Sequence, residues 1–294
     1  LNSYPMGFYS PAQLVQDAKR HAVTVYDVDI NASSYDHTLE AVDGIDSKQQ
    51  PFALRLGLRQ IKGLSRQAAD TVVAQRPTTG YQKLSDIKGL GYEQQTVTQK
   101  DLNALASSGA LHSFGDNRYV LRWLMMDDLY DLPLFRPLAP SVHDKVQQPA
   151  YITRPDDQDN LIEDYQTLGL SLNHHPIALL QRHNQLGRFT QVQHLATIHH
   201  QKPVTVIGVV TGRQSPGTAS GITFVTLEDH TGSSNIIVWQ ATAHAQKQAF
   251  LTSRILKVQG ILEREGDVCH IIAGKLTDLS HLLEKLNPKA RHFH

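Results

Sequence analysis

The sequence predicts a multidomain α+β protein in which a helical module precedes a five-stranded β-barrel. Between residues 203 and 276, five short runs rich in β-branched residues follow one another, with one segment of helical length after the third run. Between residues 51 and 130, two glycine turns each open a helix-like run. A chain of 294 residues can bury a core and is expected to hold two or three domains.

The barrel is predicted from the order of its runs and from the turns between them. The order strand, strand, strand, helix, strand, strand is typical of an OB fold. Turn residues around Gly232 and Gly266 separate the second run from the third and the fourth from the fifth. We therefore expect an OB-fold domain at residues 201–280 and a C-terminal tail at 281–294. The expected strands are Val204–Thr211, Ile222–Leu227, Asn235–Trp239, Arg254–Leu262 and Val268–Leu276, and the expected helix is Ala241–Leu251.

Residues 51–130 are expected to form a tandem helix-hairpin-helix module. The first hairpin is Ile61–Ser65 with a helix through Gln75, and the second is Ser108–Leu111 between the helices Lys100–Ser107 and Asn117–Met126. Glycine permits the tight turn, and the amides at the start of the next helix can hold a DNA phosphate. The alternative is an ordinary turn between helices. The residues expected to bind duplex DNA are Lys62, Gly63, Ser65, Arg66, Gly109 and Arg118.

A third glycine sequence, Ile87–Gly91, is interpreted as part of a connector because polar residues without a clear apolar stripe follow it. The charges agree weakly with a DNA-binding role. The whole chain carries 28 basic and 28 acidic residues, while residues 51–130 carry 10 and 7. The overall balance argues against a wholly basic nucleic-acid-binding protein, and a few solvated lysines would also explain the local surplus.

Residues 1–50 begin with a helix expected from Pro11 to about His21, followed by a strand at Val23–Ile30. Asp27 and Asp29 would point to one face of that strand, as two carboxylates that hold Mg²⁺ do. We favour the alternative that they are turn formers, because no third carboxylate lies nearby. We therefore expect no metal site there.

Residues 131–200 are expected to be a linker and a short helical connector. The linker should run to about Asp159, and short helices broken by turns should follow. The paired histidines lack the usual metal-ligand spacings, so no structural metal is expected. The single Cys269 and the absence of a long apolar run predict a cytoplasmic protein without a membrane span.

Four separate blocks of the sequence together match one known family. They are Asn2–Pro11 with Asp17–His21, Leu56–Leu64, Leu168–Leu172 with His175-Pro176, and Pro216–Gly221 continuing into Phe224–Asp229. These blocks resemble error-prone DNA polymerases of the bacterial C family, which are relatives of the replicative polymerase III α subunit. The C-terminal Arg291–His294 also resembles the family's ending. The family commonly has glycine where this chain has Ala22, a difference that affects only a turn.

This resemblance implies that residues 1–50 are the end of a fingers region and that the chain is the C-terminal third of a longer enzyme. The catalytic aspartates and their Mg²⁺ would belong to a palm domain that precedes Leu1, so this part should not polymerise alone and should need no cofactor. The implied function is DNA handling in translesion synthesis and damage-induced mutagenesis. The alternative is a free-standing nucleic-acid-binding or scaffold protein that joins hairpin and OB modules.

Two further sites are predicted. The first is a basic and aromatic track on the OB face for the single-stranded template, although Phe224 and Trp239 could instead be core. The second is a sliding-clamp peptide at Asp131–Phe135, in which Leu132, Leu134 and Phe135 are the apolar anchors and Asp131 stands where bacterial clamp-binding peptides have glutamine. A plain hydrophobic plug is the alternative, and other mutagenesis proteins are further candidate partners. The track would consist of Arg213, Phe224, Trp239, Lys257 and Arg264.

Overall fold

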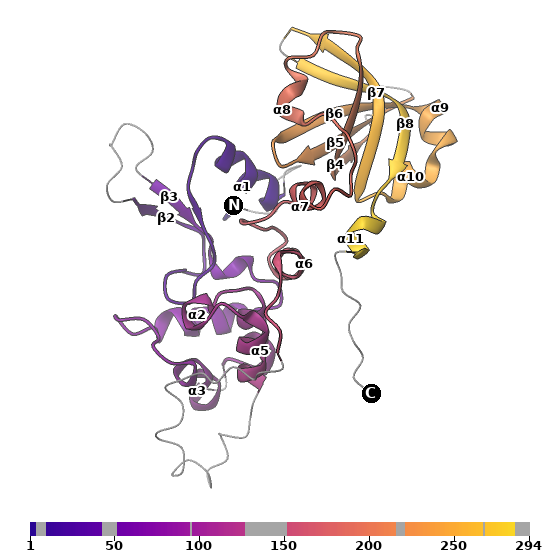
Figure 1. The fold of residues 1–294 in the computed structure, drawn as a ribbon. Helices are drawn as coiled ribbons and strands as arrows, with labels where there is room; N and C mark the ends of the chain where they lie inside the picture. The colour runs from indigo at the N-terminus through magenta and orange to yellow at the C-terminus, as the bar shows by residue number, and fades with distance from the viewer. Residues whose placement is uncertain are drawn as a thin grey trace, which may run out of the picture. The chain divides into compact units, whose positions relative to one another are not determined.

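The computed structural model describes residues 1–3, 10–42, 52–94, 96–126, 152–215, 221–266 and 268–285. The chain divides into two compact units (Figure 1). We call Leu1–Leu172 the hairpin unit and Asn173–His294 the barrel unit.

The hairpin unit begins with a helix and a small sheet. The helix α1 (Pro11–Arg20) starts as predicted, because Ser10 and Gln13 form a capping box and proline occupies the first turn. Ala22 follows it with φ of 61°, the left-handed conformation that suits glycine. The sheet has the order β1-β3-β2, with β1 parallel and β2 antiparallel to the central strand. Its strands are β1 (Val25–Tyr26), β2 (Thr38–Ala41) and β3 (Phe52–Arg55).

The predicted strand Val23–Ile30 is thus largely wrong, since only two of its residues belong to a strand. Asp29 begins a turn instead, which its side chain stabilises by accepting a hydrogen bond from the amide of Asn31 at 2.7 Å. This geometry agrees with the interpretation of Asp29 as a turn former.

Helices make up the rest of the hairpin unit. Both hairpins lie where predicted, but the first is preceded by a single 3₁₀ turn rather than a full helix. The segment 87–91, expected in a connector, lies inside a regular helix, and α6 begins before the predicted end of the linker because Asp156 caps it. The elements are η1 (Leu58–Gln60), α2 (Arg66–Ala74), α3 (Leu84–Gln94), α4 (Gln99–Ser107), η2 (His112–Phe114), α5 (Arg118–Met126) and α6 (Asp157–Thr167).

One hydrophobic core joins these elements. It extends from Val15 of α1 through Leu56 and Leu105 to Leu170, which follows α6. The end of the expected fingers segment, both hairpins and the residues after α6 therefore share a single apolar interior, whose burial supplies the main favourable term for folding this unit.

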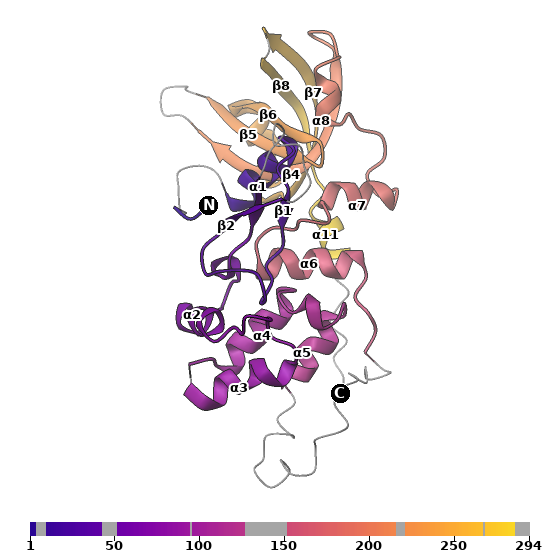
Figure 2. The same ribbon diagram turned by 90° about the vertical axis from the view of Figure 1, so that its left-hand side faces the viewer.

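The barrel unit contains a closed five-stranded barrel of order β4-β5-β6-β8-β7, which confirms the predicted OB fold (Figure 2). The expected single helix at Ala241–Leu251 is instead two short helices that meet at Gln246. The strands are β4 (Pro203–Gln214), β5 (Ile222–Asp229), β6 (Gly232–Trp239), β7 (Ile255–Glu265) and β8 (Val268–Asp278). The helices are α7 (Pro176–Arg182), α8 (Val192–Leu195), α9 (Gln240–Ala245), α10 (Lys247–Thr252) and α11 (His281–Lys285).

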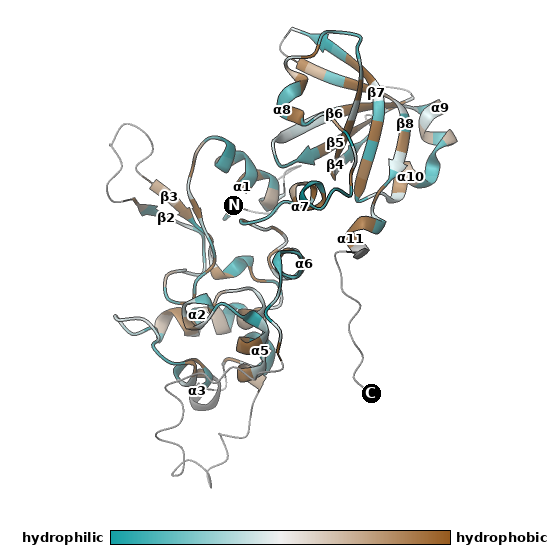
Figure 3. Ribbon diagram, viewed as in Figure 1, coloured by the Kyte–Doolittle hydropathy of each residue, from teal (hydrophilic) through white to brown (hydrophobic). Residues whose placement is uncertain are grey.

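Apolar side chains that alternate with polar ones along the strands fill the interior of the barrel. Brown and teal residues alternate along its strands in Figure 3, and inward side chains such as Val225, Ile236 and Leu262 form its core. Gly260 allows β7 and β8 to close, since a Cβ atom there would lie 2.1 Å from the carbonyl oxygen of Ile272. The register shifts at this point, as at a β-bulge.

Candidate nucleic-acid interface

The first hairpin has the backbone geometry that its sequence predicts. Gly63 adopts φ of 86°, and Ser65 caps α2 by accepting a hydrogen bond from the amide of Ala68 at 3.1 Å. Lys62, however, is directed at the end of α6. Its amide donates to the carbonyl oxygen of Thr167 at 2.8 Å, and its Nζ donates to that of Tyr165 at 3.0 Å.

A buried carboxylate holds the hairpin against α4. Asp101 accepts hydrogen bonds from the amide of Ser65 at 2.8 Å and from the amide of Thr98 at 2.9 Å. Burial alone would raise the pKa of Asp101, but the hydrogen bonds from Thr98 and Ser65 together hold this pKa below its ordinary value. One residue therefore caps α4 and also fixes the start of α2. Sequence reasoning could have found the first role from the Thr98-x-x-Asp101 capping box, but not the second.

Arginines surround an aromatic ring next to this hairpin. The guanidinium carbons of Arg59 and Arg66 lie 5.7 and 4.8 Å from the centroid of the Tyr35 ring. Arg59 is bound to Asp36 at 2.6 Å, whereas the side chain of Arg66 is 74% exposed and lies 3.5 Å from Asp70, whose side chain is 56% exposed. Arg66 therefore remains available to a ligand, because exposed ion pairs of this kind are weak.

The second hairpin uses its arginine differently. Gly109 has φ of 82°, but Arg118 folds back and donates to the carbonyl oxygen of Ser107 at 3.2 Å and to Asp164 at 2.9 Å. Ser171 donates to the other oxygen of Asp164. The two charged side chains are only 14% and 9% exposed. Arg118 therefore joins α6 to the hairpin, and its predicted contact with DNA would require this ion pair to open.

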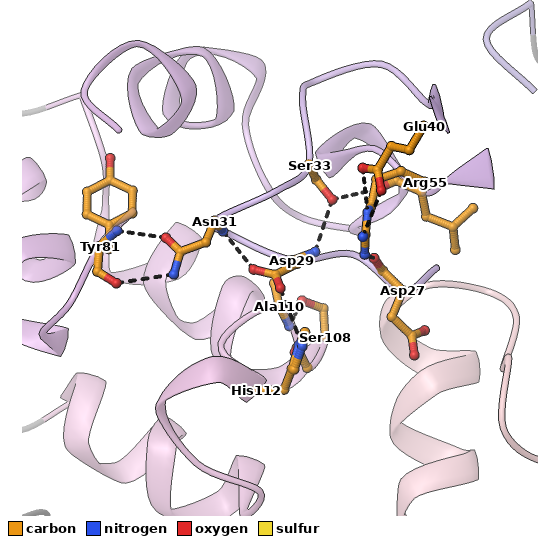
Figure 4. Close-up of polar contacts among 12 residues, drawn as sticks. Asp27, Asp29, Asn31, Ser33, Glu40, Arg55, Tyr81, Ser108, Ala110 and His112 are labelled. Atoms are coloured by element: carbon orange, nitrogen blue, oxygen red, sulfur yellow. Dashed lines mark hydrogen bonds and ion pairs between the residues drawn. The ribbon is translucent and has the colours of Figure 1, made fainter. Parts of the chain in front are cut away.

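A polar loop that includes residues 27–33 connects the small sheet with the second hairpin and with Tyr81, which precedes α3 (Figure 4). Asn31 pairs with the backbone of Tyr81 through its oxygen at 2.8 Å and its amide nitrogen at 3.1 Å. Asp29 lies 3.4 Å from His112 of the second hairpin, and the carboxylate of Asp27 points away from it. Among the described residues no cluster of three or more histidine, cysteine or acidic side chains could hold a metal ion.

The barrel presents an apolar outer face. Strand pairing places Phe224 beside Ile237, and Ile222 beside Trp239, on the outside of β5 and β6. The row continues from Ile237 to residues 272 and 261 of the next two strands. Trp239 is 47% exposed, so the alternative that it belongs to the core is wrong. Phe224 is half-buried on the same outer face.

The cations of the predicted track do not join this face. Arg213 donates to the carbonyl oxygens of Phe250 at 2.8 Å and Ser253 at 2.6 Å, at the end of α10. Arg264 likewise donates to three carbonyl oxygens at 195, 196 and 198, at the end of α8. Both arginines therefore satisfy helix C-termini, and burial lowers the pKa of Arg213.

Lys257, the remaining cation of the track, pairs across strands with Ile207 and Thr277. Lys257 therefore belongs to a different part of the barrel wall from β5 and β6, which carry Phe224 and Trp239. The candidate clamp peptide, Asp131–Phe135, lies outside the described residues. No described helix is long and apolar enough to cross a membrane.

Comparison with known proteins agrees with the two modules. A family model for the helix-hairpin-helix motif matches residues 22–121, and a model for an OB-fold nucleic acid binding domain matches residues 204–279. The error-prone DNA polymerase of Vibrio vulnificus (strain YJ016) is 50% identical over 295 aligned residues, which cover 100% of this chain. That of Pseudomonas fluorescens (strain Pf0-1) is 40% identical over 294. The chain is homologous to the error-prone DNA polymerases.

This chain spans 27% of the length of these polymerases. The resemblance expected from four sequence blocks is thus confirmed over the whole chain, and the hairpin and OB modules indicate nucleic-acid binding. Part of the chain also aligns with asparaginyl-tRNA synthetase from Pyrococcus horikoshii at 18% identity and a TM-score of 0.28, covering 32% of this chain and 23% of that one.

Proposed function

We propose that this chain is the C-terminal DNA-handling part of an error-prone DNA-directed DNA polymerase that acts in translesion synthesis and damage-induced mutagenesis. The observation that carries the proposal is the match over the whole chain to error-prone DNA polymerases at 50% identity. In this proposal the hairpin unit binds primer–template duplex through its phosphates, and the barrel unit binds single-stranded template through its bases.

The division of labour is supported by the geometry of each unit. The hairpin unit carries Gly63 in a tight turn beside exposed basic side chains, which suits a phosphate backbone. The outer face of β5 and β6 carries Phe224 and Trp239, which suit unpaired bases because every base offers a π-face for stacking. The palm aspartates and their Mg²⁺ belong to another part of the polymerase, so this part is expected to be inactive alone and to work in the cytoplasm.

The test is DNA binding by the whole chain, measured by fluorescence anisotropy over a range of salt concentrations. Duplex binding should weaken steeply with salt, with a slope in log K of about −0.9 for each phosphate contacted. Single-strand binding should be less sensitive to salt. A chain that binds neither probe would contradict the proposal, and a polymerase assay of the same preparation should show no nucleotide incorporation.

Recruitment by a sliding clamp is a second part of the proposal. The support is the sequence Asp131-Leu132-Pro133-Leu134-Phe135, whose three apolar residues match the pattern of a clamp-binding peptide. Clamp titrated with the chain should bind, and the double variant Leu134→Ala/Phe135→Ala should not. If both bind equally or neither binds, recruitment must come through a partner such as another mutagenesis protein.

A further inference from the structure

Two lysines are close to the first hairpin in the fold, and they differ in what their ammonium groups contact. Lys62 belongs to the hairpin itself, but its Nζ donates to the carbonyl oxygen of Tyr165. A Cβ atom on Gly169 would lie 3.3 Å from that same Nζ. The lysine that the sequence favours as a phosphate ligand is therefore directed at the chain's own backbone.

Lys100 comes from α4, which is the first helix of the second hairpin. A Cβ atom on Gly63 would lie 3.9 Å from Cε of Lys100. It would meet no other heavy atom within 4 Å among the described residues, apart from its chain neighbours. Lys100 is exposed, and it forms no ion pair with any described acidic residue. The space above the glycine is thus open and bordered by a free cation.

The backbone at this point also offers a donor. The amide of Gly63 makes no hydrogen bond to another described residue, whereas the amides of its neighbours Lys62 and Leu64 are both bonded, as is that of Ser65. The turn thus combines an amide that no described residue binds with a lysine side chain beside it, and an amide and an ammonium are donors that a phosphodiester oxygen accepts from.

Asp101 makes this arrangement a fixed one. It follows Lys100 directly on α4 and binds the amide of Ser65 at 2.8 Å, which holds α4 against the hairpin. Its carboxylate is buried, so it is not itself presented to a ligand. Asp101 therefore positions α4, and its neighbour Lys100 supplies the positive charge.

We propose that Gly63 and Lys100 form a binding site for one phosphodiester of the duplex, shared between the two hairpins. The site rests on the proposed function, because it assumes that the hairpin unit binds duplex DNA. It assigns the phosphate-binding lysine to α4 instead of to the hairpin that contains the glycine. The two hairpins then act on one DNA strand as a single unit.

The experiment measures binding of the whole chain to a fluorescein-labelled 20-base-pair duplex across salt concentrations. Lys100→Ala should reduce the steepness of the salt dependence by about 0.9, the value for one lost phosphate contact. Lys100→Arg should keep the wild-type slope, because the charge remains. Lys62→Ala should change the slope by less than Lys100→Ala does. Lys247→Ala, which removes an exposed lysine of α10 in the barrel unit, should leave duplex binding unchanged.

An unchanged slope in Lys100→Ala overturns the site while the wild-type slope still supports the proposed function. Equal losses in Lys100→Ala and Lys100→Arg also overturn it, since they would show a structural role. A wild-type chain without duplex binding overturns the proposed function and the site together. Thermal unfolding of each variant shows whether the protein is folded, so that a smaller salt slope can be assigned to a lost phosphate contact.

Discussion

The hairpin unit and the barrel unit differ in what their positive charges contact. In the hairpin unit Arg66 and Lys100 are exposed beside a glycine turn. In the barrel unit Arg213 and Arg264 are bound to carbonyl oxygens at helix ends. The exposed outer face of β5 and β6 is apolar and aromatic instead. A surplus of basic residues therefore indicates a phosphate-binding surface only where tertiary contacts leave the cations free.

Substitution of Arg118 tests this comparison most strongly. Arg118 belongs to the hairpin unit, but it is bound to groups of the chain itself, as Arg213 and Arg264 of the barrel unit are. Arg118→Ala should lower the free energy of unfolding of the hairpin unit by about 3–5 kcal/mol, since it leaves Asp164 buried without its partner. Urea unfolding measures this loss. Arg154→Ala is the control and should cost less than about 1 kcal/mol, because both members of its pair are exposed. If Arg118→Ala is stable but binds duplex weakly, Arg118 contacts DNA after all.

A buried histidine in each unit offers a matched test of pH. Burial lowers the pKa of both His37 and His175 to about 4, and each Nδ1 accepts a hydrogen bond from a backbone amide. Between pH 6.5 and 4 the unfolded chain binds protons that the folded chain does not, so stability falls as the pH falls. The loss from pH 7 to 4 should be on the order of 2–3 kcal/mol per histidine.

His37→Asn should flatten this pH dependence in the hairpin unit only, and His175→Asn in the barrel unit only, because an asparagine oxygen can replace the Nδ1 acceptor without titrating. Thermal unfolding at pH 7 and at pH 4.5 is the measurement. A pH dependence that survives both substitutions would assign it to other groups.

Trp239 tests the apolar face of the barrel. Trp239→Ala should weaken single-strand binding by about 1–3 kcal/mol, the usual contribution of one stacked base. The slope against salt should stay the same, because no phosphate contact is lost. Duplex binding by the same variant serves as the control and should not change. If the slope falls with the affinity, the barrel binds phosphates and the two units do not differ as proposed.

The smallest expected effect concerns the hairpin cations that the sequence itself indicates. Lys62→Ala/Arg66→Ala should weaken binding to all duplex sequences alike and reduce the salt slope by less than the value of about 1.8 for two full phosphate contacts. The reason is that Lys62 already contacts the carbonyl oxygen of Tyr165. A reduction of the full size would show that this ammonium turns to the DNA.

Local sequence determined the barrel strands, the glycine turns and most helix starts. β-Branched runs, glycine turns and capping residues act on their own neighbours, so their patterns are visible along the chain. The prediction of a strand at Val23–Ile30 was wrong because of another local effect, since Asp29 and Asn31 favour a turn over a strand. The prediction of a single helix at Ala241–Leu251 was wrong at Gln246, where the helix is interrupted. The side chain of Gln246 forms hydrogen bonds with the backbone of β8.

Only the tertiary structure decided which cations are available to a ligand. The acceptors that bind Arg118, Arg213 and Arg264 lie up to 46, 40 and 69 residues away in the sequence. The proximity of Lys100 to Gly63 is not visible in the sequence, because Gly63 is 37 positions earlier and the contact between Asp101 and Ser65 brings the two together. Composition and motifs give the charge of each segment of the sequence. Which carbonyl or carboxylate binds a given cation depends on packing between elements that are distant in the sequence.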